Sequence, residues 1–375
     1  MTDTLLNHRA EGPSSAPPLL LGPSLGTSYA LWDKVAPELS ITHRVVRWDL
    51  PGHGGSAPGL IKPGATIGDI ADLVLALADS LGIERFAYAG VSLGGGVGLH
   101  LALHHPDRVS SLAVICSSAH FNGSKPWEER AELVRREGLG TLVESAPARW
   151  FTPGFTVPEL VRDQRDADPE AYAACCDALA AFDVRDRLPE ISAHTLLIAG
   201  REDKATPPPH LREIADAVPD ATLVELPGCA HLAPAQCPEA VLTALRAHLD
   251  GGAKRGMEVR REVLGDAHVD RAQARQTPFT ARFQDFISRY AWGEIWTDPT
   301  LSRRERSMIT LTALVAHGHY DELAMHVRAA RRNGLTPEEI GAVLLQTAVY
   351  CGVPAANSAF AAAQRVLAEE AEAEG

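Results

Sequence analysis

The chain has 375 residues, of which 45% are hydrophobic and 22% are charged, and its formal net charge is −13 at pH 7. This is the composition of a globular protein, and the length suggests about two domains. The acidic balance argues against nucleic acid and anionic membrane surfaces as partners, because both attract clustered positive charge.

The N-terminal residues carry no signal-peptide pattern, and no stretch approaches transmembrane length. The six cysteines are scattered without a C-x-x-C pair, which favours reduced thiols over a disulfide framework or a zinc site. We therefore expect a cytoplasmic protein with no bound metal.

Short apolar runs alternate with helical periodicity through the first part of the chain. Strands are predicted at residues 17–22, 43–49, 86–89 and 109–116, and helices at 67–81 and 97–104. This alternation is typical of a mostly parallel sheet covered by helices. His53, in a dense turn after the second strand, is expected to be structural.

The motif Gly90-Val91-Ser92-Leu93-Gly94 lies where a predicted strand reverses into a helix. The residues two before and two after the serine must be small to let strand and helix approach, and both are glycine. Such a turn would expose the Ser92 hydroxyl as a nucleophile at a helix N-terminus. The alternative is a glycine-rich turn whose serine only caps the helix.

From about residue 119 to residue 190 the alternation stops, and a mostly helical insertion is predicted to lie over the sheet as a cap. Arg149 and Trp150 are the cap residues that we most expect to touch a substrate. Core packing is the alternative role for an aromatic side chain in a helical cap.

The strand–helix pattern resumes with strands at 195–199 and 222–226. Asp203 lies in the turn after the first of them and His231 in the loop after the second, which gives the chain order Ser, Asp, His. His231 would take the proton of Ser92, and Asp203 would orient and stabilise the imidazole. Glu202 is the alternative acidic residue.

A loop of small residues, Gly22 to Ser28, follows the first predicted strand. Such a loop can present a backbone N–H as one oxyanion donor, here that of Leu25, and the amide of Leu93 after the nucleophile is the other. Ser24 in the same loop is expected to contact substrate. The alternative is an ordinary Gly/Pro/Ser loop.

Residues 17–249 resemble an α/β-hydrolase-fold enzyme, a mostly parallel sheet with a helical cap, and within that fold the 3-oxoadipate enol-lactonases. The resemblance is carried by the segments Gly22–Thr27, Asp49–Gly54, Gly90–Gly94, Arg149–Thr152 and Gly228–His231. It departs at Pro23, where many of these enzymes have asparagine, but the backbone donors are untouched. The resemblance implies a serine hydrolase that opens a small lactone.

Glycines and charges at residues 247–256 predict a short linker, which divides the chain into domains at 1–250 and 251–375. Beyond the linker, helices are predicted at 279–291, 302–316, 320–333, 337–350 and 355–374. The second domain is therefore expected to be small and all-α.

Glu322 and His326 stand four residues apart on one face of a predicted helix. By pattern alone a surface Glu–His pair is the better interpretation, and the spacing is not that of a zinc site. The segment from Gly256 to about Leu367 nevertheless resembles the 4-carboxymuconolactone decarboxylases. The segments that carry this resemblance are Arg260–Gly265, Leu301–Ser307, Glu322–His326 and Val349–Asn357.

This second resemblance implies that His326 delivers a proton, that Glu322 positions it, and that Arg304 or Arg306 contacts the substrate anion. The family's substrate is an unsaturated γ-lactone whose own carbonyl accepts the electrons left behind by CO₂, so no cofactor is needed. Thiol-redox chemistry is not expected without a C-x-x-C. Relatives of this domain form helical ring oligomers, so we expect a homo-oligomer through the C-terminal domain.

Together the two resemblances imply a bifunctional enzyme acting on small lactones in two consecutive steps of protocatechuate breakdown, because the product of the decarboxylase is the substrate of the lactonase. Two alternatives stay open. One is a single-activity esterase or lactonase whose helical domain serves only for oligomerisation. The other is a non-catalytic binding protein, against which a complete set of Ser92, Asp203 and His231 argues.

Overall fold

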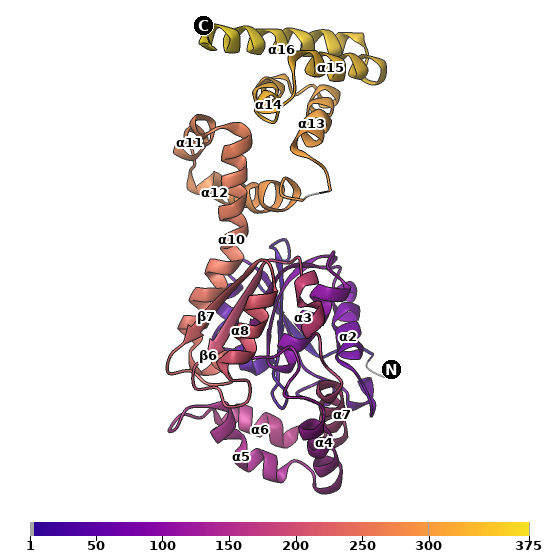
Figure 1. Ribbon diagram of the computed structural model, residues 1–375, viewed down its shortest axis with the longest axis vertical. Coiled ribbons are helices and arrows are strands. Elements are labelled where there is room, and N and C mark those ends of the chain that lie inside the picture. The colour runs from indigo at the N-terminus through magenta and orange to yellow at the C-terminus, as the bar shows by residue number, and fades with distance from the viewer. Residues whose placement is uncertain (1–3, 299, 375) are drawn as a thin grey trace. The chain divides into compact units, whose positions relative to one another are not determined.

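The computed structural model describes residues 4–298 and 300–374, with side chains except at 250–255, 278, 282, 285, 289, 294, 373 and 374. The chain divides into two compact units, Met1–Leu249 and Asp250–Gly375 (Figure 1). Each unit has hydrophobic clusters of its own.

The first unit is built on a seven-stranded sheet with the strand order β1-β3-β2-β4-β5-β6-β7. Its strands are β1 (His8–Glu11), β2 (Pro18–Gly22), β3 (Arg44–Trp48), β4 (Phe86–Val91), β5 (Val109–Ile115), β6 (Thr195–Gly200) and β7 (Ala221–Leu226). In the described sheet only β1 is antiparallel to its neighbour, and the other pairs are parallel. Strand β1 was not predicted from the sequence.

Helices cover both faces of this sheet. Outside the cap they are η1 (Tyr29–Trp32), α1 (Ala36–Leu39), η2 (Pro58–Leu60), α2 (Ile67–Ser80), α3 (Leu93–His104), α8 (Pro208–Ala217), α9 (Ala233–Gln236) and α10 (Pro238–Leu264). Successive strand residues face opposite sides of a sheet. Leu20 accordingly packs with α2, α3 and α8, whereas Leu19 and Leu21 pack with η1, α1 and the start of α10.

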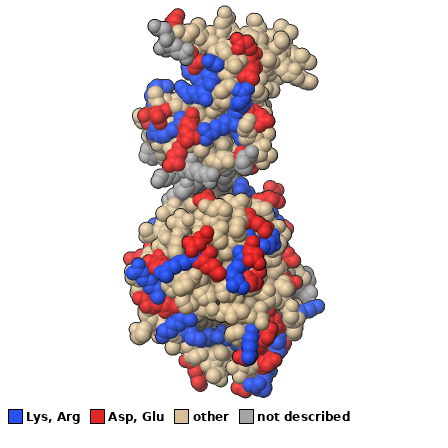
Figure 2. Space-filling view, viewed as in Figure 1, with Lys and Arg blue, Asp and Glu red and all other residues tan. Residues whose placement is uncertain are grey.

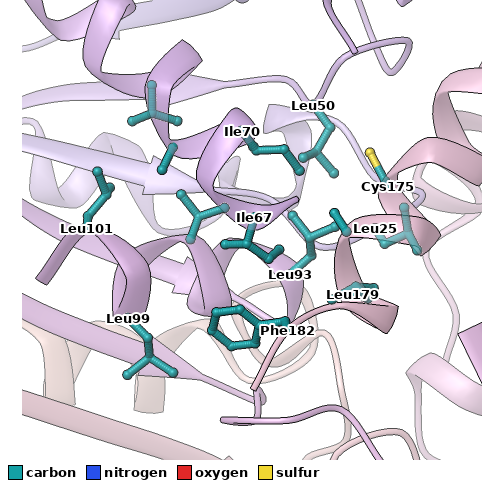
Figure 3. Packing of buried hydrophobic residues seen from close by; sticks show 14 of the residues in the cluster. Leu25, Leu50, Ile67, Ile70, Leu93, Leu99, Leu101, Cys175, Leu179 and Phe182 are labelled. Carbon is teal, nitrogen blue, oxygen red and sulfur yellow. The ribbon is translucent and has the colours of Figure 1, made fainter. Parts of the chain in front are cut away.

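Four helices form the cap between β5 and β6, inside the predicted insertion. They are α4 (Lys125–Glu137), α5 (Gly140–Trp150), α6 (Pro158–Asp166) and α7 (Pro169–Ala180), and the turn η3 (Arg185–Glu190) follows them. In Figure 1 the four helices lie together at one end of the sheet. Leu179 of α7 is buried in the same cluster as Leu25 and Leu93 (Figure 3), so the cap packs on the segments around the predicted nucleophile.

The second unit is entirely helical over its described residues. Beside the end of α10 it contains α11 (Asp266–Ala274), α12 (Pro278–Ile287), the π-helical segment η4 (Ser288–Ile295), α13 (Arg303–His317), α14 (Tyr320–Arg332), α15 (Pro337–Cys351) and α16 (Val353–Glu374). Ser302 and Thr336 start α13 and α15 with capping boxes. One hydrophobic cluster contains residues of α13, α14, α15 and α16. A second contains residues of α10, α11, η4 and α14.

The linker predicted at residues 247–256 was wrong, because α10 continues without a break from Pro238 to Leu264. A glycine costs about 1 kcal/mol relative to alanine inside a helix, which weakens a helix without forbidding it. Buried Leu245 and Val259 give α10 apolar contacts on both sides of the glycines. Helix α11 was not predicted, and the predicted helix 279–291 is divided between α12 and η4.

All six cysteines are free thiols, and four of them are buried. Among the described residues, we find no helix with the length and apolar character needed to cross a membrane. Acidic and basic side chains are interspersed over the visible face of the first unit (Figure 2).

Candidate active sites

The turn between β4 and α3 holds Ser92 at φ 55° and ψ −116°, a conformation that non-glycine residues rarely adopt. A Cβ on Gly90 would collide with the carbonyl oxygen of Gly94, and a Cβ on Gly94 would lie 2.6 Å from Pro23 O. Both positions therefore require glycine. The Ser92 side chain makes no capping hydrogen bond to α3, so the alternative of a serine that only caps the helix does not describe it.

Asp203 follows β6 and His231 follows β7, and the parallel sheet brings these two strand ends together. His231 Nδ1 donates to Asp203 Oδ2 at 2.9 Å. Asp203 also accepts from the amides of Ala205 and Thr206 and from the Thr206 hydroxyl. Burial raises the pKa of the Asp203 carboxyl, but the charge and hydrogen bond of His231 and the bonds from Thr206 outweigh it, and the pKa is lowered.

The neighbouring acid, Glu202, has a different set of contacts. Its carboxylate accepts from the amides of Gly228 at 3.2 Å and Cys229 at 3.0 Å. It therefore holds the backbone of the loop that carries His231, while Asp203 contacts the imidazole itself.

The two segments that carry Leu25 and Leu93 are bonded to each other. Gly94 N donates to Pro23 O at 3.1 Å, which fastens the loop after β2 to the start of α3. Leu93 is the first residue of α3, and an amide at that position has no acceptor within its own helix. Ser24 O accepts from Thr27 N at 3.1 Å and from Thr27 Oγ1 at 2.8 Å, which folds the loop around Leu25.

The same loop is bonded to the cap. Ser28 donates to Asp163 Oδ2 from its amide at 3.1 Å and from its hydroxyl at 2.6 Å. Asp163 belongs to α6, so this carboxylate ties a cap helix to the loop that carries Leu25. Burial raises the pKa of the Asp163 carboxyl. The two hydrogen bonds from Ser28 lower it, but burial has the larger effect.

Of the two predicted cap contacts, Trp150 is buried in a hydrophobic cluster and packs edge-on against Phe151, with ring centroids 6.4 Å apart. Trp150 therefore packs in the core, which was the alternative to substrate contact in the sequence analysis. Its carbonyl oxygen accepts from Leu232 N at 3.2 Å, so its backbone lies beside the loop of His231. Arg149 is half-buried and donates to Leu142 O at 3.1 Å.

Buried polar groups that the sequence analysis did not single out as binding residues gather beside Arg149. Gln164 Nε2 lies 3.5 Å from the Tyr172 hydroxyl, and the pKa of Arg149 is lowered by burial and raised in part by Tyr172. The His53 ring stacks on Tyr172 at 5.9 Å between centroids. Among the described residues Gln164 Oε1, His53 Nε2 and Arg149 Nε are buried without a hydrogen-bond partner. Gln164 packs against Gly26, next to Leu25.

In the second unit, His326 and Glu322 lie on α14 as predicted, one turn apart. His326 is half-buried and Glu322 is exposed. Burial first and then His268 lower the pKa of His326 to about 4, against an opposing effect of Glu322. His326 is therefore neutral at neutral pH in the free protein.

The two predicted arginines are engaged in other contacts. Arg304 pairs with Glu339 at 2.5 Å and also donates to Gly334 O. Arg306 donates to Asp298 O at 2.7 Å, and its Nε is buried without a partner among the described residues. Neither is among the charged groups found to act on His326, whereas His268 of α11, which the sequence analysis did not single out, is.

Comparison with known proteins divides the chain in the same way. Residues 19–244 match the family described as "Alpha/beta hydrolase family", and residues 281–365 match the "Carboxymuconolactone decarboxylase family".

Over 251 residues the chain is 34% identical to 3-oxoadipate enol-lactonase 2 of Acinetobacter baylyi, a match that covers 65% of this chain and 93% of the relative. Over 114 residues it is 46% identical to 4-carboxymuconolactone decarboxylase of the same species, covering 30% of this chain and 85% of the relative. The crystal structure of the enol-lactonase from Burkholderia xenovorans LB400 superposes with a TM-score of 0.61 and 34% identity, over 65% of this chain and 96% of that one. The chain therefore belongs to the α/β hydrolase family through its first unit and to the carboxymuconolactone decarboxylase family through its second.

Proposed function

We propose that this chain is a bifunctional enzyme that works without a cofactor. Its second unit decarboxylates 4-carboxymuconolactone to 3-oxoadipate enol-lactone, and its first unit hydrolyses that enol-lactone to 3-oxoadipate. The observation that carries the proposal is the presence, on one chain, of relatives of two enzymes whose named substrates are joined by the loss of CO₂.

In the hydrolase, Ser92 Oγ attacks the lactone carbonyl carbon while His231 takes its proton. Asp203 stabilises the resulting imidazolium across the 2.9 Å hydrogen bond. The amides of Leu25 and Leu93 hold the oxyanion. The ring oxygen leaves as an enol, which becomes the ketone, and a water activated by His231 then releases the acyl group from Ser92.

The carboxylate side arm of the lactone is assigned to the cap. Arg149 supports this assignment, because its guanidinium is half-buried and its Nε is buried without a partner among the described residues. Gln164 and Tyr172 add hydrogen-bonding groups beside it. Ser24 and Trp150 are assigned to the walls of the site, since one shares the loop of Leu25 and the other is bonded to the loop of His231.

In the decarboxylase, loss of CO₂ leaves an electron pair that the ring double bond conjugates with the lactone carbonyl, so the substrate stabilises its own carbanion. His326 delivers the proton to carbon, and Glu322, one turn away, positions it. Both predicted anion contacts are paired, Arg304 with Glu339 and Arg306 with Asp298, and Arg306 is the better candidate because its Nε is buried without a hydrogen-bond partner among the described residues.

A coupled assay tests the proposal. Purified protein is given 4-carboxymuconolactone, and CO₂ and 3-oxoadipate are followed in wild type, Ser92→Ala and His326→Ala. Ser92→Ala should release CO₂ and accumulate enol-lactone, whereas His326→Ala should release none but still open enol-lactone added to it. Wild type that opens enol-lactone without releasing CO₂ would leave a single-activity lactonase.

We also propose that the enzyme acts in the cytoplasm as a homo-oligomer joined through its second unit. Six free cysteines support the compartment. Oligomerisation is supported by an apolar groove of about 640 Å³ lined by residues of α13 and α15, among them Ile309, which is 56% exposed. Val349 and Tyr350 are exposed further along α15, and apolar side chains seldom gather on the surface of a monomer.

A further inference from the structure

One hydrophobic cluster of the second unit brings a second histidine towards His326. Helix α11 begins after Gly265, whose φ of +84° suits glycine. Val269 of α11 and Ala329 of α14 are both fully buried in this cluster. His268 precedes Val269 in the chain, and His326 lies one turn before Ala329 on the same side of α14. Both imidazoles therefore border the same cluster.

Arg260 approaches this cluster from α10, one turn before the buried Val263. The residue is 6% exposed, and its Nη1 donates to Gln284 Oε1 at 3.0 Å. Its Nε is buried and has no hydrogen-bond partner among the residues whose side chains are described. Burying a guanidinium N–H without an acceptor is costly. Such a group favours an anionic ligand.

The charges around His268 have the same sign. Burial lowers the pKa of His268, and the guanidinium groups of Arg260, Arg271 and Arg332 lower it further. Arg332 is held in place by a 2.8 Å hydrogen bond from its Nη1 to Leu264 O. The region attracts negative charge.

We propose that Arg260 and His268 bind the carboxylate that the lactone keeps during decarboxylation, and so hold its ring against His326. This inference rests on the decarboxylation proposed above and identifies the residues that recognise the substrate's charge. The leaving carboxylate loses its charge in the transition state, so a strong ion pair to it would stabilise the ground state and slow the reaction. The carboxylate of the acetate side arm keeps its charge throughout, and an ion pair there does not oppose the chemical step.

The atoms and charges balance as follows. The bond from the ring carbon to the leaving carboxylate breaks, and its electron pair passes through the ring double bond to the lactone carbonyl oxygen. His326, neutral in the free protein, first takes up a proton from solvent beside the bound dianion, and the resulting imidazolium gives that proton to the ring carbon next to the carbonyl. His326 takes up one proton from water in each turnover, so the dianionic lactone and a proton yield the monoanionic enol-lactone and CO₂.

Variants of the full-length chain test the assignment. Arg260→Gln should lower kcat/KM for CO₂ release about 100-fold, mainly through KM, because it leaves a substrate charge unpaired. His268→Gln should lower it about 10-fold, because it replaces the imidazole donor to the same carboxylate. Arg261→Gln is the matched control, since Arg261 is the next residue on α10 and pairs with Asp266 and Asp270 at the surface. It should stay within about twofold of wild type. Thermal melting, together with the charge-keeping Arg260→Lys, separates loss of fold from loss of binding.

A substrate analogue makes the test specific to the retained carboxylate. A lactone whose acetate arm ends in a carboxamide still carries the leaving carboxylate. Wild type should turn it over about 100-fold less efficiently than the acid, and Arg260→Gln should lose nothing further on it. An equal loss on acid and carboxamide in Arg260→Gln would overturn the assignment, because the arginine would then act on some other part of the reaction.

Calorimetric binding of the lactone in a His326→Ala background separates this inference from the proposed function. If wild type releases no CO₂, but His326→Ala binds the lactone and the added Arg260→Gln abolishes binding, the proposed decarboxylation fails while the assignment stands. If the lactone binds equally with and without Arg260→Gln, the assignment fails. If it does not bind at all, both fail.

Discussion

His231 Nδ1 lies 2.9 Å from Asp203 Oδ2, and the two side chains are 5% and 0% exposed. In a buried pair of this kind the carboxylate determines which imidazole nitrogen carries the proton, so Nε2 is left free to accept one. Glu202 stands next in the chain but bonds to the amides of Gly228 and Cys229. The two acids can therefore be told apart by experiment.

Asp203→Asn should lower kcat for enol-lactone hydrolysis about 10⁴-fold, because the amide would stabilise the wrong imidazole tautomer. KM and the release of CO₂ should change little. Glu202→Gln is the control and should lose no more than a few-fold in kcat, with a lower melting temperature. Steady-state kinetics on supplied enol-lactone distinguish the two, and a larger loss in Glu202→Gln would reverse the assignment.

The strained backbone at Ser92 predicts a difference between two inactive variants. Ser92→Gly should be more stable than Ser92→Ala by about 1 to 2 kcal/mol, because glycine adopts a positive φ without the steric cost of a Cβ. Both should lack hydrolysis, so activity does not confuse the comparison. Urea unfolding followed by fluorescence measures the difference, and equal stability would mean that the turn is not strained.

Gly94→Ala should damage both hydrolysis and stability. Its Cβ would lie 2.6 Å from Pro23 O, so the loop that carries Leu25 would have to move away from α3. We expect a loss of at least about 2 kcal/mol in the free energy of unfolding, as for other overpacked sites. Gly59→Ala is the control, because a Cβ there meets nothing within 4 Å. Similar losses in both variants would rule out the proposed collision as the cause.

The lowered pKa of His53 should make the free energy of unfolding depend on pH. Burial lowers its pKa from 6.5 to about 4. Between these values the unfolded chain binds a proton that the folded chain does not, so stability falls as the pH drops from 6.5 towards 4, by on the order of 3 kcal/mol in all. His53→Asn keeps a side-chain donor but does not titrate. Its unfolding free energy should fall less between pH 7 and pH 4.5 than that of wild type, and parallel curves would contradict the prediction.

If the apolar groove between α13 and α15 is the oligomer interface, a charge placed in it should weaken oligomerisation. Ile309→Asp should shift the protein towards monomers, because the groove would lose apolar area and would have to bury a charge on association. Sedimentation velocity of wild type and variant measures the shift. Ile41→Asp changes an exposed isoleucine of the first unit and should leave assembly unchanged.

The strands and the chain order of Ser92, Asp203 and His231 could be predicted because they depend on local patterns. Apolar runs of strand length, a turn that demands glycine and acidic or histidine residues after strands are all visible within a few neighbouring residues. The choice between Asp203 and Glu202 depends on which side chain faces the imidazole, and only the folded turn determines that. The cap was predicted as a helical insertion, but Gln164 and Tyr172 meet only through its packing.

The structure at the beginning of the second unit, in α10 and α11, was harder to predict from the sequence. Glycines at 251 and 252 looked like a linker, since local propensity does not record the apolar contacts that hold α10 together on either side. His268 was missed for a related reason. No sequence motif marks a single histidine shortly after a glycine as a functional residue. Only the packing of α11 against α14 places His268 near His326.

The bonds from Ser28 to Asp163 join the cap to the loop that carries Leu25. Helix α6 cannot move away from the sheet without releasing the loop that carries Leu25, because the amide and the hydroxyl of Ser28 both end on this one carboxylate. If the Leu25 amide holds the oxyanion as we propose, any displacement of α6 would therefore disturb that donor together with the cap.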